Sequence, residues 1–210
     1  MIIIGAKGHA KDILSVLSIN KKLDHLYFYD DVSPDSPQLL YGVYPILRSA
    51  NEAKKVLEDN ADFVLGIGNP KLRCNLANKF KDLGGTLRSV IAPTSSIGNH
   101  EVKLGAGINI MTGVIITNSV IIGEGALINA GVQIHHDVSV GRYTELSPGV
   151  ILTGGVSVGE FTIIGTGAKV LPNIKIGDHV VVGAGAIVTK DIPSFSQVVG
   201  IPARIVKFSN

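Results

Sequence analysis

Aliphatic residues recur at every sixth position of the stretch 104–193, and no insertion interrupts the count. The fifth position of each six-residue unit is small or β-branched throughout, as at Val114 and Ala126. Such a fixed period is typical of a solenoid, in which each short unit stacks on its neighbours. The first positions are Leu104, Ile110, Ile116, Ile122, Ile128, Ile134, Val140, Leu146, Leu152, Val158, Ile164, Val170, Ile176, Val182 and Val188.

A second period, three units long, lies over the first, because every third unit opens with an aliphatic residue followed by glycine, as in Ile122-Gly123 and Val140-Gly141. Three units with one short strand each predict a triangular coil of a parallel β-helix, with the first and fifth positions inside. We expect these glycines to supply corner backbone angles that a Cβ would penalise. A β-sandwich does not fit, since its strands would break register at every turn.

The two ends of the repeat are irregular. The step from Ile97 to Leu104 is one residue longer than a unit, so we expect one extra residue in a first, irregular coil. After Pro193 the six-residue pattern stops, and we expect the tail around Val198–Arg204 to cover the open end of the solenoid.

Residues 1–85 have a different pattern, in which apolar strands alternate with helical stretches. We predict strands in 1–5, 25–31 and 61–69, and helices that begin near Ser49 and Pro70. This alternation favours a small α/β domain of the doubly wound, Rossmann-like kind. We therefore expect two domains, 1–85 and 86–210, the second being the β-helix.

Three segments fall where the parallel strands of the first domain would end, which is where such sheets bind ligands. They are the loop 5–10 with Lys7, Gly8 and His9, the pair Asp30-Asp31, and the segment 66–69 with Gly68 and Asn69. The loop would place a helix N-terminus against an anion, although a plain tight turn explains it equally well. The two carboxylates would accept from ribose hydroxyls or merely belong to a solvated loop. Together the three segments favour a nucleotide site.

Composition and charge exclude several classes of protein. The formal net charge of +2 gives no signal for nucleic acid, and no long apolar run predicts insertion into a membrane. The single cysteine, Cys74, forms no internal disulfide, and no secretory signal is visible. We expect a cytoplasmic protein.

Two histidines stand together in the repeat. His136 occupies the third, outward position of its unit, next to Asp137 and one coil before Gly154. An exposed imidazole beside a carboxylate suits a general base, because the carboxylate fixes the tautomer. An ordinary surface histidine is the alternative. A zinc site would need imidazoles that converge from neighbouring coils, and His100, His135, His136 and His179 do not share such a face, so we expect no metal.

The sixth positions of the repeat predict an interface. They should face outward, yet seven of them are aliphatic, and we expect an apolar prism face that another copy covers. Scattered exposed side chains are the alternative. The seven residues are Ile115, Ile121, Leu127, Ile151, Ile163, Val181 and Ile187.

Five motifs follow one another along the chain, namely Gly5-Ala6-Lys7-Gly8-His9-Ala10, Tyr29-Asp30-Asp31, Gly66-Ile67-Gly68-Asn69-Pro70, Ile134-His135-His136-Asp137 and Gly200-Ile201-Pro202-Ala203-Arg204. With these motifs in this order, the whole chain resembles the bacterial sugar O-/N-acyltransferases of the sialic-acid O-acetyltransferase type. That group includes acetyltransferases for nucleotide-linked 4-amino sugars such as bacillosamine and perosamine. Many acyltransferases share the six-residue repeat, so the N-terminal domain ahead of it is the feature that narrows the choice of family.

The resemblance implies a left-handed β-helix, a homotrimer, and acetyl-CoA in the groove between neighbouring prisms. It implies that His136 is the general base, that Asp137 assists it, and that the backbone N–H of Gly154 holds the acetyl carbonyl. Thr166 and Ala184 match positions where main chain contacts the pantetheine arm. The residues that match the sugar-nucleotide site are Gly8, His9, Asp30, Asp31, Gly68 and Asn69.

One position departs from the pattern: Glu145 stands where several amino-sugar relatives carry a second histidine. We therefore expect an acetyl-CoA-dependent N-acetyltransferase of a nucleotide-linked amino sugar in surface-glycan synthesis, with its exact acceptor left open. An O-acetyltransferase for sialic acid or a related sugar is the near alternative. A non-catalytic trimer that binds a nucleotide sugar is the alternative of another class.

Overall fold

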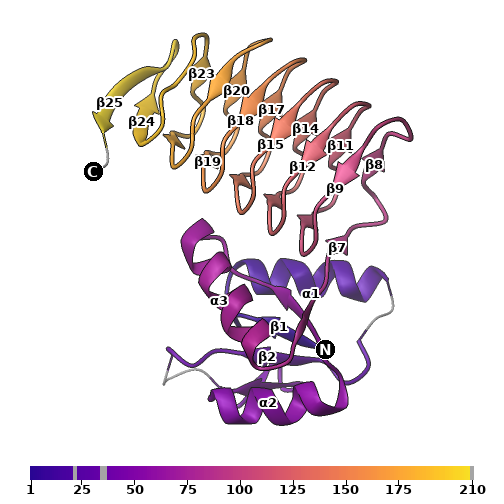
Figure 1. Ribbon diagram of the computed structural model, residues 1–210. Coiled ribbons are helices and arrows are strands. Elements are labelled where there is room, and N and C mark those ends of the chain that lie inside the picture. The colour runs from indigo at the N-terminus through magenta and orange to yellow at the C-terminus, as the bar shows by residue number, and fades with distance from the viewer. Residues whose placement is uncertain (21–22, 34–36, 209–210) are drawn as a thin grey trace. The chain divides into compact units, whose positions relative to one another are not determined.

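The computed structural model describes residues 1–20, 23–33 and 37–208 (Figure 1). The chain divides into two compact units, Met1–Val90 and Ile91–Asn210. The division falls slightly beyond the expected boundary at 85/86, because Thr86–Leu87 pairs with the strand Asp62–Leu65 and so extends the N-terminal sheet.

The N-terminal unit is an α/β domain around one six-stranded sheet, whose strand order is β3-β4-β2-β1-β5-β6. All neighbours pair in parallel except β3 and β4. Figure 1 shows α1 and α2 on opposite sides of this sheet. The strands are β1 (Ile2–Ile4), β2 (Tyr27–Tyr29), β3 (Leu39–Leu40), β4 (Tyr44–Leu47), β5 (Asp62–Leu65) and β6 (Thr86–Leu87), and the helices are α1 (His9–Ile19), α2 (Ala50–Asp59) and α3 (Pro70–Asp82).

Helix caps explain where α2 and α3 begin. The Ser49 hydroxyl accepts from the N–H of Glu52 at 3.3 Å, while the Glu52 carboxylate accepts from the N–H of Arg48 at 2.7 Å. These contacts satisfy two backbone donors that a helix start leaves open. Pro70 occupies the first turn of α3, where its missing N–H costs nothing.

The C-terminal unit is the expected left-handed parallel β-helix, with three sheets of mostly two-residue strands. One face holds β7 (Val90–Ile91), β10 (Asn109–Ile110), β13 (Leu127–Ile128), β16 (Glu145–Leu146), β19 (Ile163–Ile164), β22 (Val181–Val182), β24 (Ser196–Val199) and β25 (Arg204–Phe208). The second face holds β8 (Ser96–Ile97), β11 (Ile115–Ile116), β14 (Gln133–Ile134), β17 (Ile151–Leu152), β20 (Lys169–Val170) and β23 (Ile187–Val188). The third face holds β9 (Lys103–Leu104), β12 (Ile121–Ile122), β15 (Ser139–Val140), β18 (Ser157–Val158) and β21 (Lys175–Ile176).

The register of the β-helix follows the sequence period. Ile116 pairs with Ile134, which lies exactly three units further along the chain. Ile97 pairs with Ile116, which lies three units and one residue further, so the extra residue belongs to the first coil as expected. First-position residues such as Ile134 and fifth-position residues such as Val150 are fully buried and form the core. Burial of their aliphatic side chains provides the main stabilising free energy, at about 25 cal/mol per Å² of apolar surface.

The repeated glycines serve a purpose that differs from our expectation. Gly105, Gly123 and Gly141 do not have positive φ angles. A Cβ built on any of them would lie 2.5 Å from a backbone nitrogen of the next coil, so they allow close approach between coils. The positive φ angles instead occur two residues later, at fourth positions such as Gly125 and Tyr143.

The tail also differs from our expectation. The β-helix continues for one more strand after Pro193, because β24 pairs in parallel with β22 and buries Val198 completely. Only then does β25 turn back antiparallel to β24.

Our prediction of one apolar prism face was wrong. The seven aliphatic sixth positions lie on all three faces, because successive units belong to successive sheets. Ile121 is 51% exposed on the third face, whereas Leu127 is buried on the first. The residues divide as Leu127, Ile163 and Val181 on the first face, Ile115, Ile151 and Ile187 on the second, and Ile121 on the third.

Candidate active site

His136 and Asp137 form a hydrogen-bonded pair in the turn that follows β14. Nδ1 of His136 lies 2.7 Å from Oδ2 of Asp137, and the His136 side chain is 69% exposed. Asp137 has a φ angle of 60°, a left-handed conformation that Asp tolerates better than most residues. The pair therefore projects from the prism, as its outward position in the repeat predicts.

Gly154 lies one coil beyond His136, in the turn after β17. A Cβ built on Gly154 would lie 2.5 Å from Cε1 and 2.7 Å from Nε2 of His136, so the ring occupies the space that a side chain would need. The N–H of Gly155 donates to the carbonyl of His136 at 3.0 Å, which fixes the spacing of the two turns. Within the described residues, the N–H of Gly154 donates to no protein acceptor.

Thr166 and Ala184 lie at a different corner of the prism from His136. Both are third-position residues in turns after strands of the first face, β19 and β22, whereas the turn of His136 follows the second face. The carbonyl of Thr166 accepts from the N–H of Gly185 at 2.8 Å. One chain therefore does not bring these two residues together with His136 at a single corner.

In the N-terminal unit, the loops after β1 and β5 meet at the carboxyl ends of these adjacent strands. The N–H of Gly66 donates to the carbonyl of Ile4 at 2.8 Å, and a Cβ on Gly5 would lie 2.9 Å from the Gly66 carbonyl. The two predicted segments therefore pack directly together. Lys7 and Gly8 are exposed beside them.

His9 opens α1, and its side chain is only 8% exposed. Burial lowers the pKa of its imidazole to about 4; the charge of Asp12 opposes this shift, and the charge of Arg73 adds to it. His9 is therefore neutral near neutral pH, and it differs in this burial from the exposed His136.

Asp30 and Asp31 follow β2 but already have partners within the chain. Oδ1 of the buried Asp30 accepts hydrogen bonds from the N–H groups of Val32 and Ser33, at 3.2 and 3.1 Å. Oδ2 of Asp31 accepts from the Tyr29 hydroxyl at 2.6 Å and from Lys79 at 3.0 Å. The Asp30 carboxylate thus builds its own turn, and that of Asp31 belongs to a polar cluster on the domain surface.

The pKa values of Tyr29, Asp31 and Lys79 are shifted by their contacts in this cluster and by burial. Burial alone would raise the pKa of Asp31, but the hydrogen bonds from Tyr29 and Lys79 outweigh it and lower that pKa. Lys79 has a raised pKa, first because of its 2.8 Å contact with the Tyr29 hydroxyl. Sequence reasoning missed Lys79, because its position on α3 gives no sign that it reaches the end of β2.

Asn69 and Arg73 organise the start of α3. Oδ1 of Asn69 caps the helix by accepting from the N–H of Leu72 at 3.0 Å. Nη1 of Arg73 donates to the carbonyl of Gly68, and the Arg73 side chain is completely buried. Sequence reasoning also missed Arg73, since an arginine in a helical pattern is usually exposed.

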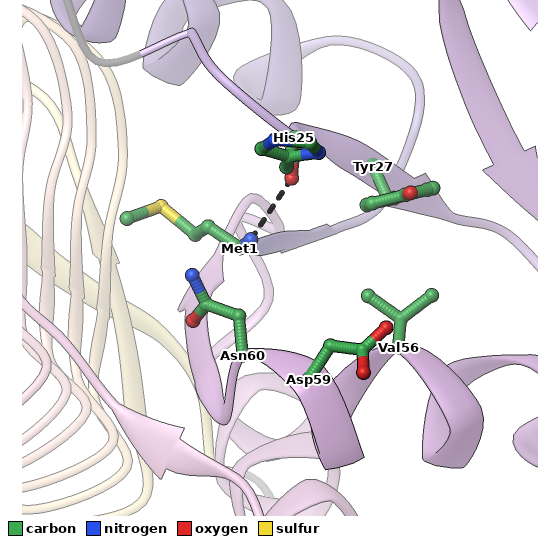
Figure 2. A pocket seen from close by; sticks show the side chains of 6 residues that line it. All are labelled: Met1, His25, Tyr27, Val56, Asp59 and Asn60. Atoms are coloured by element: carbon green, nitrogen blue, oxygen red, sulfur yellow. Dashed lines mark hydrogen bonds between the residues drawn. The ribbon is translucent and has the colours of Figure 1, made fainter.

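A pocket of about 300 Å³ opens near the amino end of the same sheet, beside the start of β1 and β2 and the end of α2 (Figure 2). No predicted site residue lines it. Its lining residues are Met1, His25, Tyr27, Val56, Asp59 and Asn60.

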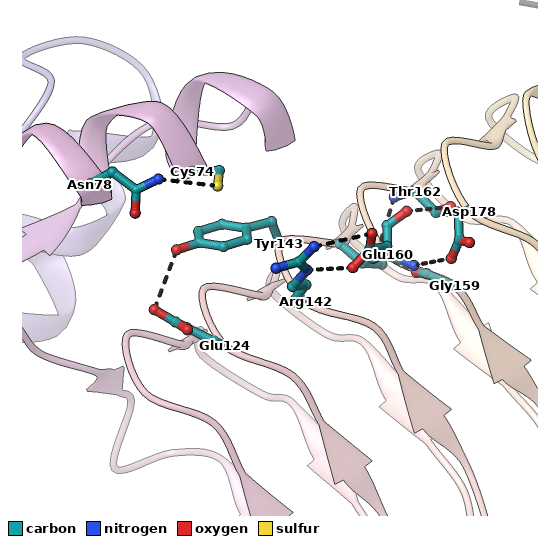
Figure 3. Close-up of polar contacts among 10 residues, drawn as sticks. Cys74, Asn78, Glu124, Arg142, Tyr143, Gly159, Glu160, Thr162 and Asp178 are labelled. Carbon is teal, nitrogen blue, oxygen red and sulfur yellow. Dashed lines mark hydrogen bonds and ion pairs between the residues drawn. The ribbon is translucent and has the colours of Figure 1, made fainter.

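The remaining corner of the β-helix carries a ladder of stacked aromatic rings. Tyr143, Phe161, His179 and Phe195 follow one another with ring centroids 5.7, 5.2 and 4.9 Å apart. Beside them, Arg142 pairs with Glu160, and the Tyr143 hydroxyl donates to Glu124 at 3.4 Å (Figure 3). The ladder links consecutive coils and holds no predicted site residue.

Residues 1–20, 23–33 and 37–208 contain no group of three histidine, cysteine or acidic side chains placed to hold a metal ion. None of the helices in the same part of the chain is long and apolar enough to cross a membrane. Cys74 lies on α3, where its sulfur is 3.9 Å from Nδ2 of Asn78 (Figure 3).

Comparison with known families agrees with both units. The PglD N-terminal domain matches residues 1–80, and the bacterial transferase hexapeptide model matches residues 119–154 and 155–190. The fold and the repeat thus define a hexapeptide-repeat acyltransferase. A comparison with curated protein sequences found no match.

Similar solved structures narrow the class of hexapeptide-repeat acyltransferases to those that act on sugars. A variant of perosamine N-acetyltransferase from Caulobacter crescentus, in complex with CoA and GDP-perosamine, is 33% identical, with a TM-score of 0.88 over 98% of this chain and 96% of that one. WeeI from Acinetobacter baumannii AYE is 27% identical (TM-score 0.89), and the acetyltransferase domain of PglB from Neisseria gonorrhoeae FA1090, with acetyl coenzyme A, is 25% identical (0.88), each over 98% of both chains. The chain belongs to this family of CoA-dependent sugar acetyltransferases.

Proposed function

We propose that the protein transfers an acetyl group from acetyl-CoA to the amine of a nucleotide-linked amino sugar, a 4-amino sugar, in surface-glycan synthesis. The observation that carries the proposal is the exposed His136–Asp137 pair beside the unused N–H of Gly154. Perosamine N-acetyltransferase, a relative 33% identical over almost the whole chain, was solved with CoA and a GDP-linked amino sugar. The sialic-acid type of acceptor has no comparable support.

In the proposed mechanism, Nε2 of His136 accepts the proton that the acceptor amine loses as its nitrogen attacks the thioester carbonyl. Asp137 holds the Nδ1–H and stabilises the imidazolium that forms. The N–H of Gly154 donates to the oxyanion of the tetrahedral intermediate. When the carbon–sulfur bond breaks, the CoA thiolate takes the proton from His136, so no covalent enzyme intermediate is needed.

We propose a homotrimer in which acetyl-CoA lies between neighbouring prisms. His136 and the proposed pantetheine contacts, Thr166 and Ala184, lie at different corners of one prism. A groove that holds all three therefore needs the corners of two copies. Each site would combine the His136 corner of one copy with the Thr166 corner of the next.

We propose that the N-terminal unit is a Rossmann-like domain that binds the nucleotide of the acceptor. Its parallel strands have the order β4-β2-β1-β5-β6. The chain first adds strands on one side of β1 and then, from β5 on, adds them on the other side, so the order of winding reverses between β1 and β5. Nucleotides bind at such a switch point. Gly8, His9, Gly68 and Asn69 lie on the two loops that meet there, with Lys7 exposed beside them. Asp30 and Asp31 follow the next strand, where the remaining acceptor positions of their carboxylates would face ribose hydroxyls.

A panel of acceptors tests the proposal, with release of CoA as the readout. UDP-, dTDP- and GDP-linked 4-amino sugars would be compared with free sialic acid. We expect turnover with a nucleotide-linked amino sugar. Turnover with sialic acid alone would establish an O-acetyltransferase, and no CoA release with any acceptor would favour a non-catalytic binding protein.

A further inference from the structure

We propose that Arg73 is a positioning residue for the nucleotide site, because it turns the backbone N–H of Asn69 toward a phosphate of the bound nucleotide. This inference rests on the function proposed above. Arg73 is completely buried, so its guanidinium does not touch the ligand itself. It acts through the peptide bond between Gly68 and Asn69.

The geometry of that peptide bond carries the inference. Nη1 of Arg73, in the first turns of α3, donates to the carbonyl oxygen of Gly68. In a trans peptide the carbonyl and the following N–H point in opposite directions. Because the guanidinium holds the Gly68 carbonyl toward the interior, the N–H of Asn69 faces away from the interior, on an exposed residue.

The start of α3 leaves this N–H available. Oδ1 of Asn69 is already used to cap the N–H of Leu72, and Pro70 has no N–H to offer. Within the described residues, the Asn69 N–H donates to no protein acceptor. It is therefore a fixed donor at the start of a helix, where the helix dipole also favours an anion.

The surroundings suit the diphosphate of a nucleotide sugar. The loops after β1 and β5 pack together, so the starts of α1 and α3 lie at the same edge of the sheet. The buried charge of Arg73 adds a positive potential behind these two helix starts, and it contributes to the lowered pKa of the imidazole of His9, the first residue of α1. Low dielectric around a buried cation makes its field stronger than that of an exposed lysine.

Two variants of Asn69 isolate the backbone donor. Asn69→Ala and Asn69→Pro both remove the side-chain cap, but only the proline removes the N–H, and the φ angle of −60° already suits proline. Binding of UDP, GDP and dTDP and of the matching nucleosides would be measured by calorimetry. For the diphosphate that binds the wild-type protein, we expect Asn69→Pro to bind about 10- to 100-fold more weakly than Asn69→Ala, with equal nucleoside affinity.

Substitutions of Arg73 test the buried cation itself. We expect Arg73→Lys and Arg73→Met to weaken the binding of the nucleoside diphosphate more than the binding of the nucleoside. Both variants should also raise KM for the acceptor, while KM for acetyl-CoA stays unchanged. Equal affinity of the two Asn69 variants for the diphosphate would overturn the proposed role of the peptide bond between Gly68 and Asn69. An equal loss of affinity for nucleoside and diphosphate in the Arg73 variants would overturn it as well. If the wild-type protein binds no nucleoside diphosphate, the nucleotide site of the proposed function fails as well.

Discussion

The imidazole of His136 fills the space above Gly154, so that a Cβ at position 154 would lie 2.5 Å from Cε1 of the ring. Gly154→Ala should therefore displace the ring while it keeps the backbone N–H of residue 154. Gly154 has no positive φ angle, so the backbone itself accepts alanine. We expect kcat to fall by about 100-fold, the cost of losing a well-placed general base, with little change in the thermal midpoint.

A double variant separates displacement of the ring from damage to the oxyanion site. If Gly154→Ala acts through the imidazole, the same change in a His136→Ala background should cost almost nothing more. A further large loss of rate in that background would show that the methyl group disturbs acetyl binding instead.

His136→Ala should reduce acetyl transfer by about 10²- to 10⁴-fold, because a general base contributes a factor of that size. Asp137→Asn should also reduce kcat, since an amide does not hold the Nδ1–H tautomer as a carboxylate does. Steady-state kinetics with CoA release would measure both. The free energy of unfolding of His136→Ala should stay within about 0.5 kcal/mol of wild type because the side chain is largely exposed. Turnover near the wild-type rate would exclude His136 as the base.

The stability of the N-terminal unit should depend on pH through His9. The folded-state pKa of about 4 lies below the ordinary value of 6.5, so between these values the unfolded chain binds more protons and stability falls as pH falls. At pH 4.5 this loss amounts to about 2–3 kcal/mol relative to pH 7.

Denaturant titrations at pH 7 and 4.5 check this dependence. His9→Gln should flatten the loss between the two pH values, because it removes the buried imidazole whose pKa is lowered. Parallel losses in the wild-type protein and His9→Gln would contradict the prediction.

The aromatic ladder should stabilise the β-helix without taking part in the reaction. Phe161→Ala removes a ring that stacks on both neighbours and should cost about 1–3 kcal/mol in the free energy of unfolding. Phe161→Gly should cost about 1 kcal/mol less, because the φ angle of 53° suits glycine. Chemical denaturation measures both, and KM for acetyl-CoA should not change. A glycine variant less stable than the alanine variant would argue against backbone strain at this position.

The period of the sequence predicted the β-helix almost residue by residue, because a core of one side chain per strand leaves no freedom in the spacing. It also placed His136 and Asp137 outside, since outward positions follow directly from the repeat. It did not predict how side chains at the same position divide among faces. Ile121 and Leu127 occupy equal positions, but successive units turn to different sheets.

The N-terminal site was harder to predict, because its residues meet through tertiary packing rather than a period. The loops were located correctly at the ends of β1 and β5. The buried state of Arg73 and the contact of Lys79 with Asp31 have no signal in the sequence, since both residues belong to an ordinary helical pattern. Even the role of Gly123 was misjudged, because spacing alone does not distinguish an unusual backbone angle from crowding by the next coil.

The additional residue before β9 has a consequence for how such a chain tolerates changes in length. β8 pairs with β11 at an offset one residue longer than usual, yet β9 pairs with β12 at the regular offset, so the surplus is absorbed within one turn. Loops grafted at corners should therefore leave later columns aligned. A deletion inside a strand such as β14 would instead shift the residues that follow by one position, so that side chains of the core would point outward. It would also separate His136 from the glycine that its ring covers.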